Sequence, residues 1–292
     1  MYELIPAGER TYYIDCPAKM GVYRFTERDV CLIDSGGDGS AAKQALRRLD
    51  EQGWRLAMIL NTHSHADHVG GNALLQQRTG AIAYADPVEA AFIRDPFLEP
   101  TVLFGAYPYK EIRNKFLQAK PSDCRPLSEA PLPEGLTVHP LRGHAAGMVG
   151  FHTSDGVWFV ADALLSEETL EKYHVSYLYD LASYLRTLEA LETLEGRLFI
   201  PAHAPASPDL RPLIAKNRAK VYELQGAVLD LCRAPRTAEQ VIQGVFTRYQ
   251  LKMVHNQLAT AGATLRSYLS CLHEEGRLRA EFQDNLLLWE TV

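Results

Sequence analysis

Four side chains that can bind a metal ion lie within six residues, in the segment Thr62-His63-Ser64-His65-Ala66-Asp67-His68. Imidazole nitrogens and carboxylate oxygens suit zinc, iron and manganese. Alternate residues of an extended segment point to the same side, so His63 and His65 can share one ion. Asp67 and His68 turn away from them and can hold a second ion. The spacing therefore predicts most of a dinuclear metal site.

Three further ligands are expected at the ends of strands elsewhere in the chain. His144 follows an apolar run ending at Leu141, Asp162 follows the run Val157–Val160, and His203 follows Leu198–Ile200. A lone histidine is more often an ordinary hydrogen-bonding residue than a ligand. Together with the first segment, however, these three supply seven ligands for two ions at one rim of a sheet.

The elements that must position these residues are short strands alternating with helices. Such a mixture argues for a layered α/β domain with helices packed on sheets. The ligand segment follows the expected strand Ala57–Leu60. The other expected strands are Val22–Phe25, Val30–Ile33, Ile82–Tyr84, Thr137–Leu141, Met148–His152, Val157–Val160 and Leu198–Ile200, and the expected helices are Ala41–Leu49, Gly71–Gln77 and Asp180–Leu194.

Two regions depart from this alternation. Residues 86–135 are rich in proline and aromatic residues, and they are expected to be a long surface excursion or a lid over the site. Residues 209–292 carry 11 basic and 9 acidic residues, a net charge of +2, whereas residues 1–208 carry −8. This second region reads as three helices, Leu210–Cys232, Thr237–Val245 and Ala259–Glu275, followed by a hairpin whose turn is Gln283-Asp-Asn285. That order is the outline of a winged helix-turn-helix.

Composition excludes several classes of protein. The 292 residues have a net charge of −6, which argues against a basic nucleic-acid coat protein. No apolar run approaches the ~20 residues that span a bilayer, and the first residues lack the pattern of a signal peptide. The five cysteines are scattered and contain no CxxC motif. We therefore expect a cytoplasmic protein with reduced thiols.

The HxHxDH segment followed by His144, Asp162 and His203 resembles the metallo-β-lactamase superfamily over about residues 1–207. The resemblance implies an α/β fold, an αββα sandwich with the metals at one edge. We expect residues 208–292 to form a separate winged-helix-like domain. It also implies that His63, His65 and His144 bind the first ion and that Asp67, His68 and His203 bind the second. Asp162 matches the bridging carboxylate, and Asp34 matches a residue that orients the ligand loop. Two divalent ions, zinc first with iron or manganese as alternatives, would share a hydroxide that attacks the substrate.

The resemblance leaves several branches of the superfamily open. Exported β-lactamases are disfavoured because their second site commonly has cysteine where this chain has Asp162. The ligands suit thioester hydrolases such as glyoxalase II, lactonases, phosphodiesterases, nucleases and iron-dependent persulfide dioxygenases. A C-terminal winged helix is similar to relatives of the mitochondrial β-lactamase-like endoribonuclease. Ala145-Ala146 after His144, and the lack of a clear match to the glutathione-contacting residues, weaken the glyoxalase II interpretation.

We therefore expect a hydrolase of a small ester, thioester, lactone or phosphodiester, with Asp67 and Asp162 as catalytic residues. An RNA-acting nuclease and a mononuclear iron oxygenase are the alternatives. Nucleic acid is not favoured as a partner, because the exposed basic residues of the expected recognition helix Ala259–Glu275 include only Arg266; a homodimer is compatible with the sequence. Tyr173, His174 and Tyr177 are candidates to line the pocket. Phe104, Tyr107 and Tyr109 are candidates to cover it.

Overall fold

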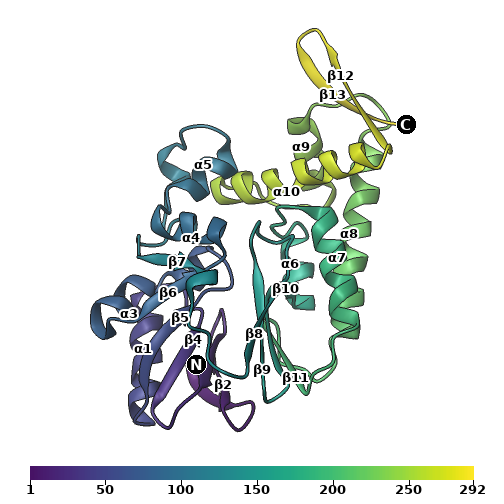
Figure 1. The fold of residues 1–292 in the computed structure, drawn as a ribbon. Helices are drawn as coiled ribbons and strands as arrows, with labels where there is room; N and C mark the ends of the chain where they lie inside the picture. Colours follow the sequence, from purple (N-terminus) through teal and green to yellow (C-terminus); the bar gives the residue numbers. More distant parts are fainter.

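The computed structural model describes residues 1–292, and it consists of two β-sheets packed face to face with helices on both outer sides (Figure 1). The first sheet has the order β1-β2-β3-β4-β5-β6-β7, with antiparallel pairs up to β4 and parallel pairs from β4 to β7. Its strands are β1 (Glu3–Pro6), β2 (Thr11–Asp15), β3 (Met20–Arg24), β4 (Asp29–Ile33), β5 (Arg55–Leu60), β6 (Ile82–Ala85) and β7 (Cys124–Pro126).

The second sheet has four strands in the order β11-β10-β9-β8. Strands β8, β9 and β10 form an antiparallel meander, and β11 pairs parallel to β10. These strands are β8 (Leu136–Pro140), β9 (Val149–Thr153), β10 (Val157–Leu165) and β11 (Leu198–His203). All the strands expected from the sequence are present, whereas the hairpin of β1 and β2 was not expected.

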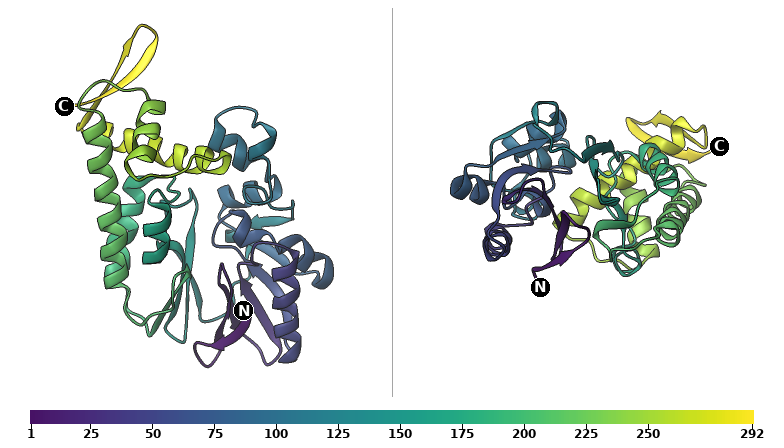
Figure 2. Two further views of the ribbon diagram at one scale, coloured as in Figure 1. Left: turned by 180° about the vertical axis from the view of Figure 1, so that it is seen from behind. Right: turned by 60° about the horizontal axis from the view of Figure 1, so that its bottom comes forward.

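Helices α1 (Gly39–Glu51), α3 (Asn72–Thr79) and α4 (Pro87–Arg94) cover the first sheet, and α6 (Glu167–Tyr173), α7 (Leu181–Glu192) and α8 (Arg211–Leu231) cover the second (Figure 2). Helix α1 shows why. Asp38 caps its first turn by accepting from the N–H groups of Ser40 and Ala41, and its buried residues form one apolar stripe. The four layers are the expected αββα sandwich.

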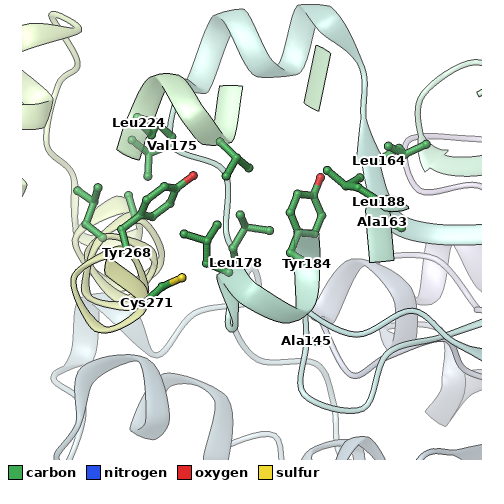
Figure 3. Packing of buried hydrophobic residues seen from close by; sticks show 14 of the residues in the cluster. Ala145, Ala163, Leu164, Val175, Leu178, Tyr184, Leu188, Leu224, Tyr268 and Cys271 are labelled. Atoms are coloured by element: carbon green, nitrogen blue, oxygen red, sulfur yellow. The ribbon is translucent and has the colours of Figure 1, made fainter. Parts of the chain in front are cut away.

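The C-terminal residues form α9 (Ala238–Arg248), α10 (His255–Glu274), β12 (Leu278–Gln283) and β13 (Leu286–Thr291) after α8. These elements lie where the sequence predicts three helices and a hairpin. One cluster of 32 buried residues contains side chains from both sides of the predicted boundary at 207/208. Figure 3 shows part of it, where Tyr268 of α10 lies beside Leu178, Val175 and Leu224. The winged-helix assignment and the boundary itself stay predictions.

Residues 86–135 contain several short helices and pack against the C-terminal part of the chain. Besides α4 they form α5 (Leu98–Phe104), η1 (Lys110–Ile112), β7 and η2 (Leu127–Glu129). Leu103, Ile112 and Leu117 share a small apolar cluster with Ala259 of α10. Figure 1 shows α10 lying across one end of the sandwich, between α5 and α8. None of the helices combines the length and the hydropathy that a membrane crossing requires.

Candidate metal centre

The ligand segment leaves the first sheet at the end of β5 and folds at once into the short helix α2 (Ala66–Val69). His63 and His65 precede this helix, and Asp67 and His68 lie in it. The turn after β4 runs beside the segment, where the N–H of Ser35 donates to the carbonyl of His68 at 2.7 Å. The parallel strands β4 and β5 therefore end at the edge of the sheet where the histidines gather.

Three histidines converge as the first expected set. Nδ1 of His65 lies 3.0 Å from Nε2 of His63 and 3.0 Å from Nε2 of His144. Such mutual distances allow the three nitrogens to share one ion. His144 comes from the loop between β8 and β9, so this set joins the two sheets.

Asp67, His68 and His203 form the second group, and Asp162 lies between the two groups. Nε2 of His203 is 3.2 Å from Oδ2 of Asp67 and 3.4 Å from Oδ2 of Asp162. Asp162 also faces the first group, with Oδ2 at 3.4 Å from Nε2 of His144, and its Oδ1 is 3.2 Å from Nε2 of His68. The structure thus brings together all seven residues that the sequence singled out.

The placement of Asp162 corrects one expectation. The sequence suggested that both Asp67 and Asp162 lie on an exposed rim, Asp162 in a loop after a strand ending at Val160. Strand β10 instead continues to Leu165, and Asp162 is only 6% exposed, whereas the side chain of Asp67 is 53% exposed. The pairing of β10 with β11 changes register around Ala161, whose φ is 49°. This irregularity within a continuous strand is not visible in a run of apolar residues.

Each histidine of the centre except His65 has a hydrogen-bonding partner at the nitrogen turned away from the group. His68 Nδ1 donates to Oδ2 of Asp34 at 2.8 Å. His144 Nδ1 donates to the carbonyl of Tyr177, and His203 Nδ1 donates to that of Pro17. Because carboxylates and carbonyls only accept, these bonds fix the tautomers and leave each Nε2 free to bind a metal.

His63 is oriented through a relay that starts at Asp34. The hydroxyl of Thr62 donates to Oδ2 of Asp34 at 2.7 Å, so it can only accept from Nδ1 of His63, at 3.0 Å. The N–H of Thr62 donates to Oδ1 of Asp34 at 2.8 Å. One buried carboxylate therefore orients a histidine of each group, which is the position that the resemblance gave to Asp34.

Two buried atoms of the centre have no hydrogen-bonding partner. They are Nε2 of His68 and Oδ1 of Asp162, which lie 3.2 Å apart. Buried polar atoms are rarely left without partners in native proteins, and a cation bound between this nitrogen and this oxygen would satisfy both. The donor set contains imidazoles and carboxylates but no thiolate, since all five cysteines lie elsewhere. The residues therefore fit zinc, iron or manganese.

Burial and charge divide the histidines into two kinds. Burial lowers the pKa of His63 well below its usual range and that of His144 to about 3. The carboxylate of Asp162 raises the pKa of His203 to about 10. His63 and His144 are consequently neutral and ready to bind a cation, whereas His203 must lose a proton first.

Two open cavities flank the centre. One of about 400 Å³ reaches Asp67 and is lined by Gly37 and Pro17 and by Lys115 and Phe116 of the 86–135 region. The other, of about 820 Å³, reaches His203 and carries several carboxylates. Phe104, Tyr107 and Tyr109, the candidates to cover the pocket, do not line the cavity at Asp67, where Lys115 and Phe116 lie instead. Phe104 and Tyr109 pack on each other, and Tyr107 is 73% exposed.

The three candidate pocket residues after Asp162 have different positions. The ring of Tyr177 lies 5.2 Å from that of His65 and 5.7 Å from that of His144. His174 instead stacks on Tyr249, and Tyr173 is exposed.

Sequence reasoning missed two acidic residues of the 86–135 region. Glu89 binds the backbone of the ligand loops, and Glu99 places Oε1 3.6 Å from Nε2 of His65.

Comparison with known proteins agrees with this geometry. A family model described as "Metallo-beta-lactamase superfamily" matches residues 14–203. A hydroxyacylglutathione hydrolase of Cereibacter sphaeroides is 32% identical over 130 residues, which are 44% of this chain and 42% of that protein. The chain thus matches less than half the length of this relative. The probable metallo-hydrolase YqgX of Bacillus subtilis is 27% identical over 199 residues, 65% of this chain and 87% of that protein.

Solved structures show that the likeness extends to the C-terminal elements. The metallo-beta-lactamase family protein TTHA1429 of Thermus thermophilus superposes with a TM-score of 0.72 at 24% identity, covering 99% of this chain and 97% of that one. At this identity the similarity shows the fold alone. The match includes α9, α10 and the hairpin, so the whole arrangement occurs in another protein.

Proposed function

Because the chain belongs to the metallo-beta-lactamase superfamily, we propose that it is a dinuclear metal-dependent hydrolase acting on a small ester, thioester, lactone or phosphodiester. The observation that carries the proposal is the position of Asp162. Its two oxygens face both groups of ligands, with Oδ1 toward His68 and Oδ2 toward His144 and His203. A carboxylate in that position can bind two ions at once.

His63, His65 and His144 would hold one ion, and Asp67, His68 and His203 the other. When bound, two divalent ions supply Lewis acidity toward a carbonyl or phosphoryl oxygen and lower the pKa of a nucleophilic water. Zinc is the first choice because imidazole-rich sites of this kind suit it. Asp34 keeps His63 and His68 in the required tautomers.

Asp67 is placed to move a proton during the reaction. Its Oδ2 lies 3.2 Å from Nε2 of His203, and its side chain is half exposed at the wall of the cavity of about 400 Å³. It can therefore exchange protons with a substrate or with solvent in that cavity. Asp162, which is buried, would act through the ions that it binds.

A thioester is the substrate class best supported among the four. The relative from Cereibacter sphaeroides is a hydroxyacylglutathione hydrolase, and its matched segment covers 44% of this chain. The cavity beside Asp67 offers an ammonium group at Lys115 and a phenyl ring at Phe116. These groups favour a small substrate that carries both a negative charge and an apolar part.

We propose that the C-terminal unit is a winged-helix-like module from residue 208 that packs on the catalytic part instead of binding nucleic acid. Helix α10, the expected recognition helix, buries Ala259, Leu265 and Tyr268 against the rest of the protein. Its Arg266 is paired with Glu239 at 3.0 Å. An RNA nuclease would need a basic channel with stacking surfaces. The net charge of −8 on residues 1–208 disfavours such a channel.

The test is a hydrolysis screen over thioesters, lactones, phosphodiesters and short single-stranded RNAs, with metal analysis of the same sample. Two zinc ions per chain and turnover of a thioester support the proposal. The matched variants are Asp162→Asn, which should be inactive, and Asp50→Asn, an exposed acid of α1 that should behave as wild type. One iron per chain with oxygen consumption would favour the mononuclear oxygenase, and RNA binding that weakens steeply with salt would favour the nuclease.

A further inference from the structure

A single buried carboxylate joins the two loops that supply the first group of histidines. Glu89 lies in α4 and is 2% exposed. Its Oε2 accepts from the N–H of Ser64, and its Oε1 accepts from the N–H of Gly147, both at 2.8 Å. Each oxygen therefore binds one loop.

The two N–H groups are placed where the loops carry their ligands. Ser64 is the residue between His63 and His65, so its peptide sets the direction of both side chains. Gly147 lies three residues after His144, in the loop before β9. These loops belong to different sheets, and Glu89 fixes the position of one relative to the other.

The start of α4 holds Glu89 against the second loop. Asp86 caps the helix by accepting from the N–H of Val88 at 2.9 Å, and Pro87 occupies its first turn. The backbone of Gly147 lies so close that an added Cβ would be 2.3 Å from Oδ1 of Asp86. Because there is no room between them, the loop after His144 follows the position of α4.

The carboxylate of Glu89 has these two N–H groups as its hydrogen-bonding partners and forms no ion pair with Lys, Arg or His. Burying a carboxylate without a cationic partner is unfavourable. The carboxylate at this position is therefore better explained by its hydrogen bonds to the two loops than by hydrophobic packing.

We propose that Glu89 is a positioning residue that holds the two loops together so that His63, His65 and His144 converge on one ion. The inference rests on the proposed metal centre. It predicts that a substitution of Glu89 lowers the affinity for the ion held by His63, His65 and His144. The affinity for the ion held by Asp67, His68 and His203 should not change.

Glu89→Gln is the sharpest variant, since glutamine has nearly the same shape. Its amide oxygen can accept from one loop, but its NH₂ group then faces the N–H of the other loop, where two donors meet. Glu89→Asp keeps the charge but is one methylene shorter, so it can reach only one loop. The two variants remove the same link by different means, and either one alone suffices if the other does not fold.

Asp155→Asn is the matched control. Asp155 accepts from the N–H of Arg10 at 2.9 Å and from the hydroxyl of Thr11 at 2.7 Å. Asp155 also joins the two sheets. It lies in the turn between β9 and β10, whereas Asp162 lies in the second half of β10. Its loss affects the fold without touching the metal-binding loops.

The experiment titrates chelator-treated protein with cobalt(II), whose visible spectrum reports the geometry around each ion, and measures zinc affinity by competition with a chelating dye. We expect Glu89→Gln and Glu89→Asp to lower the binding affinity for one of the two ions by about 10–100-fold. The visible spectrum of cobalt(II) bound at that site should also change. The other ion should bind with the wild-type affinity, and Asp155→Asn should retain both.

Two results would contradict the proposal and are distinguishable. Both Glu89 variants could bind two ions with wild-type affinity and spectrum while the metal-free protein loses stability as Asp155→Asn does. That result would make Glu89 a structural residue and leave the proposed function standing. If the wild-type protein itself binds no ion, the metal centre and the role of Glu89 both fail.

Discussion

His68 donates its Nδ1 proton to Oδ2 of Asp34 across 2.8 Å, and the same oxygen accepts from the hydroxyl of Thr62. We expect Asp34→Asn to weaken zinc binding by about 10–100-fold, because an amide cannot accept from all of these donors. Asparagine tolerates the left-handed backbone of this residue, whose φ is 60°, so the fold should persist. Dye competition measures the affinity, and unchanged binding would mean that Asp34 does not orient His68.

Asp34→Ala provides the comparison. Alanine has no acceptor, and the left-handed conformation costs it about 1–2 kcal/mol. This variant should lose both metal affinity and stability, whereas Asp34→Asn should lose mainly affinity. Urea unfolding of the metal-free proteins separates the two effects.

Asp162→Asn should remove hydrolysis and also destabilise the metal-free protein. Asp162 is buried beside His68 and His203, so its removal leaves those imidazoles without their anionic partner. Breaking a buried ion pair in this way costs about 3 kcal/mol. Urea denaturation of chelator-treated samples measures the loss. Equal stability of the variant and the wild-type protein would show that these histidines are neutral without metal.

Metal binding should release protons. The carboxylate of Asp162 raises the pKa of His203 to about 10, against about 6.5 in an unfolded chain. In metal-free protein this pairing stabilises the fold fully below pH 6.5, and the contribution is lost as the pH rises through about 10. Zinc needs the neutral imidazole, so its affinity should rise with pH up to about 10. Calorimetry at pH 7.5 in buffers of different ionisation enthalpy counts the protons, and a count of zero would be inconsistent with this pairing.

The C-terminal helix supports the metal centre through one hydroxyl. Thr264 of α10 accepts from the N–H of Leu178 at 3.0 Å, and the neighbouring carbonyl of Tyr177 accepts from His144. Thr264→Val should cost about 1–3 kcal/mol, because it leaves a buried N–H without a partner. It should also weaken the metal bound at His144.

Thr247→Val is the control for this prediction. The hydroxyl of Thr247 donates to the carbonyl of Gln243 on the exposed side of α9 and accepts nothing. Its replacement should change stability by less than about 0.5 kcal/mol. Similar losses in both variants would indicate a general effect of valine in helices.

The sequence predicts which candidate metal ligands come together better than it predicts what surrounds them. His63, His65, Asp67 and His68 are visible because four ligands within six residues are rare by chance, and the strands before them are apolar runs. Glu89, by contrast, looks like an ordinary surface residue of an amphipathic helix. Its role depends on contact with Gly147, 58 residues away in sequence, and no local pattern records such a contact.

The sequence did not predict which residues of the 86–135 segment line the cavity at Asp67, and the reason is again a contact between distant parts of the chain. Phe104, Tyr107 and Tyr109 were candidates to cover the pocket because they belong to the long aromatic-rich segment 86–135. In the structure Tyr109 packs toward α10, where its hydroxyl lies 3.0 Å from Nδ1 of His255, 146 residues later. The C-terminal helix therefore engages this aromatic, and Lys115 and Phe116 are left beside the cavity.

The bond between Leu178 and Thr264 joins residues 86 positions apart in the chain. A ribosome releases α10 only after all the histidines of the candidate metal centre have emerged, and domains fold as their contacts become available. Until α10 docks, the segment that supports His144 lacks one of its hydrogen bonds. The side of the candidate metal centre that includes His144 should consequently reach its final geometry only after α10 has been made and has docked.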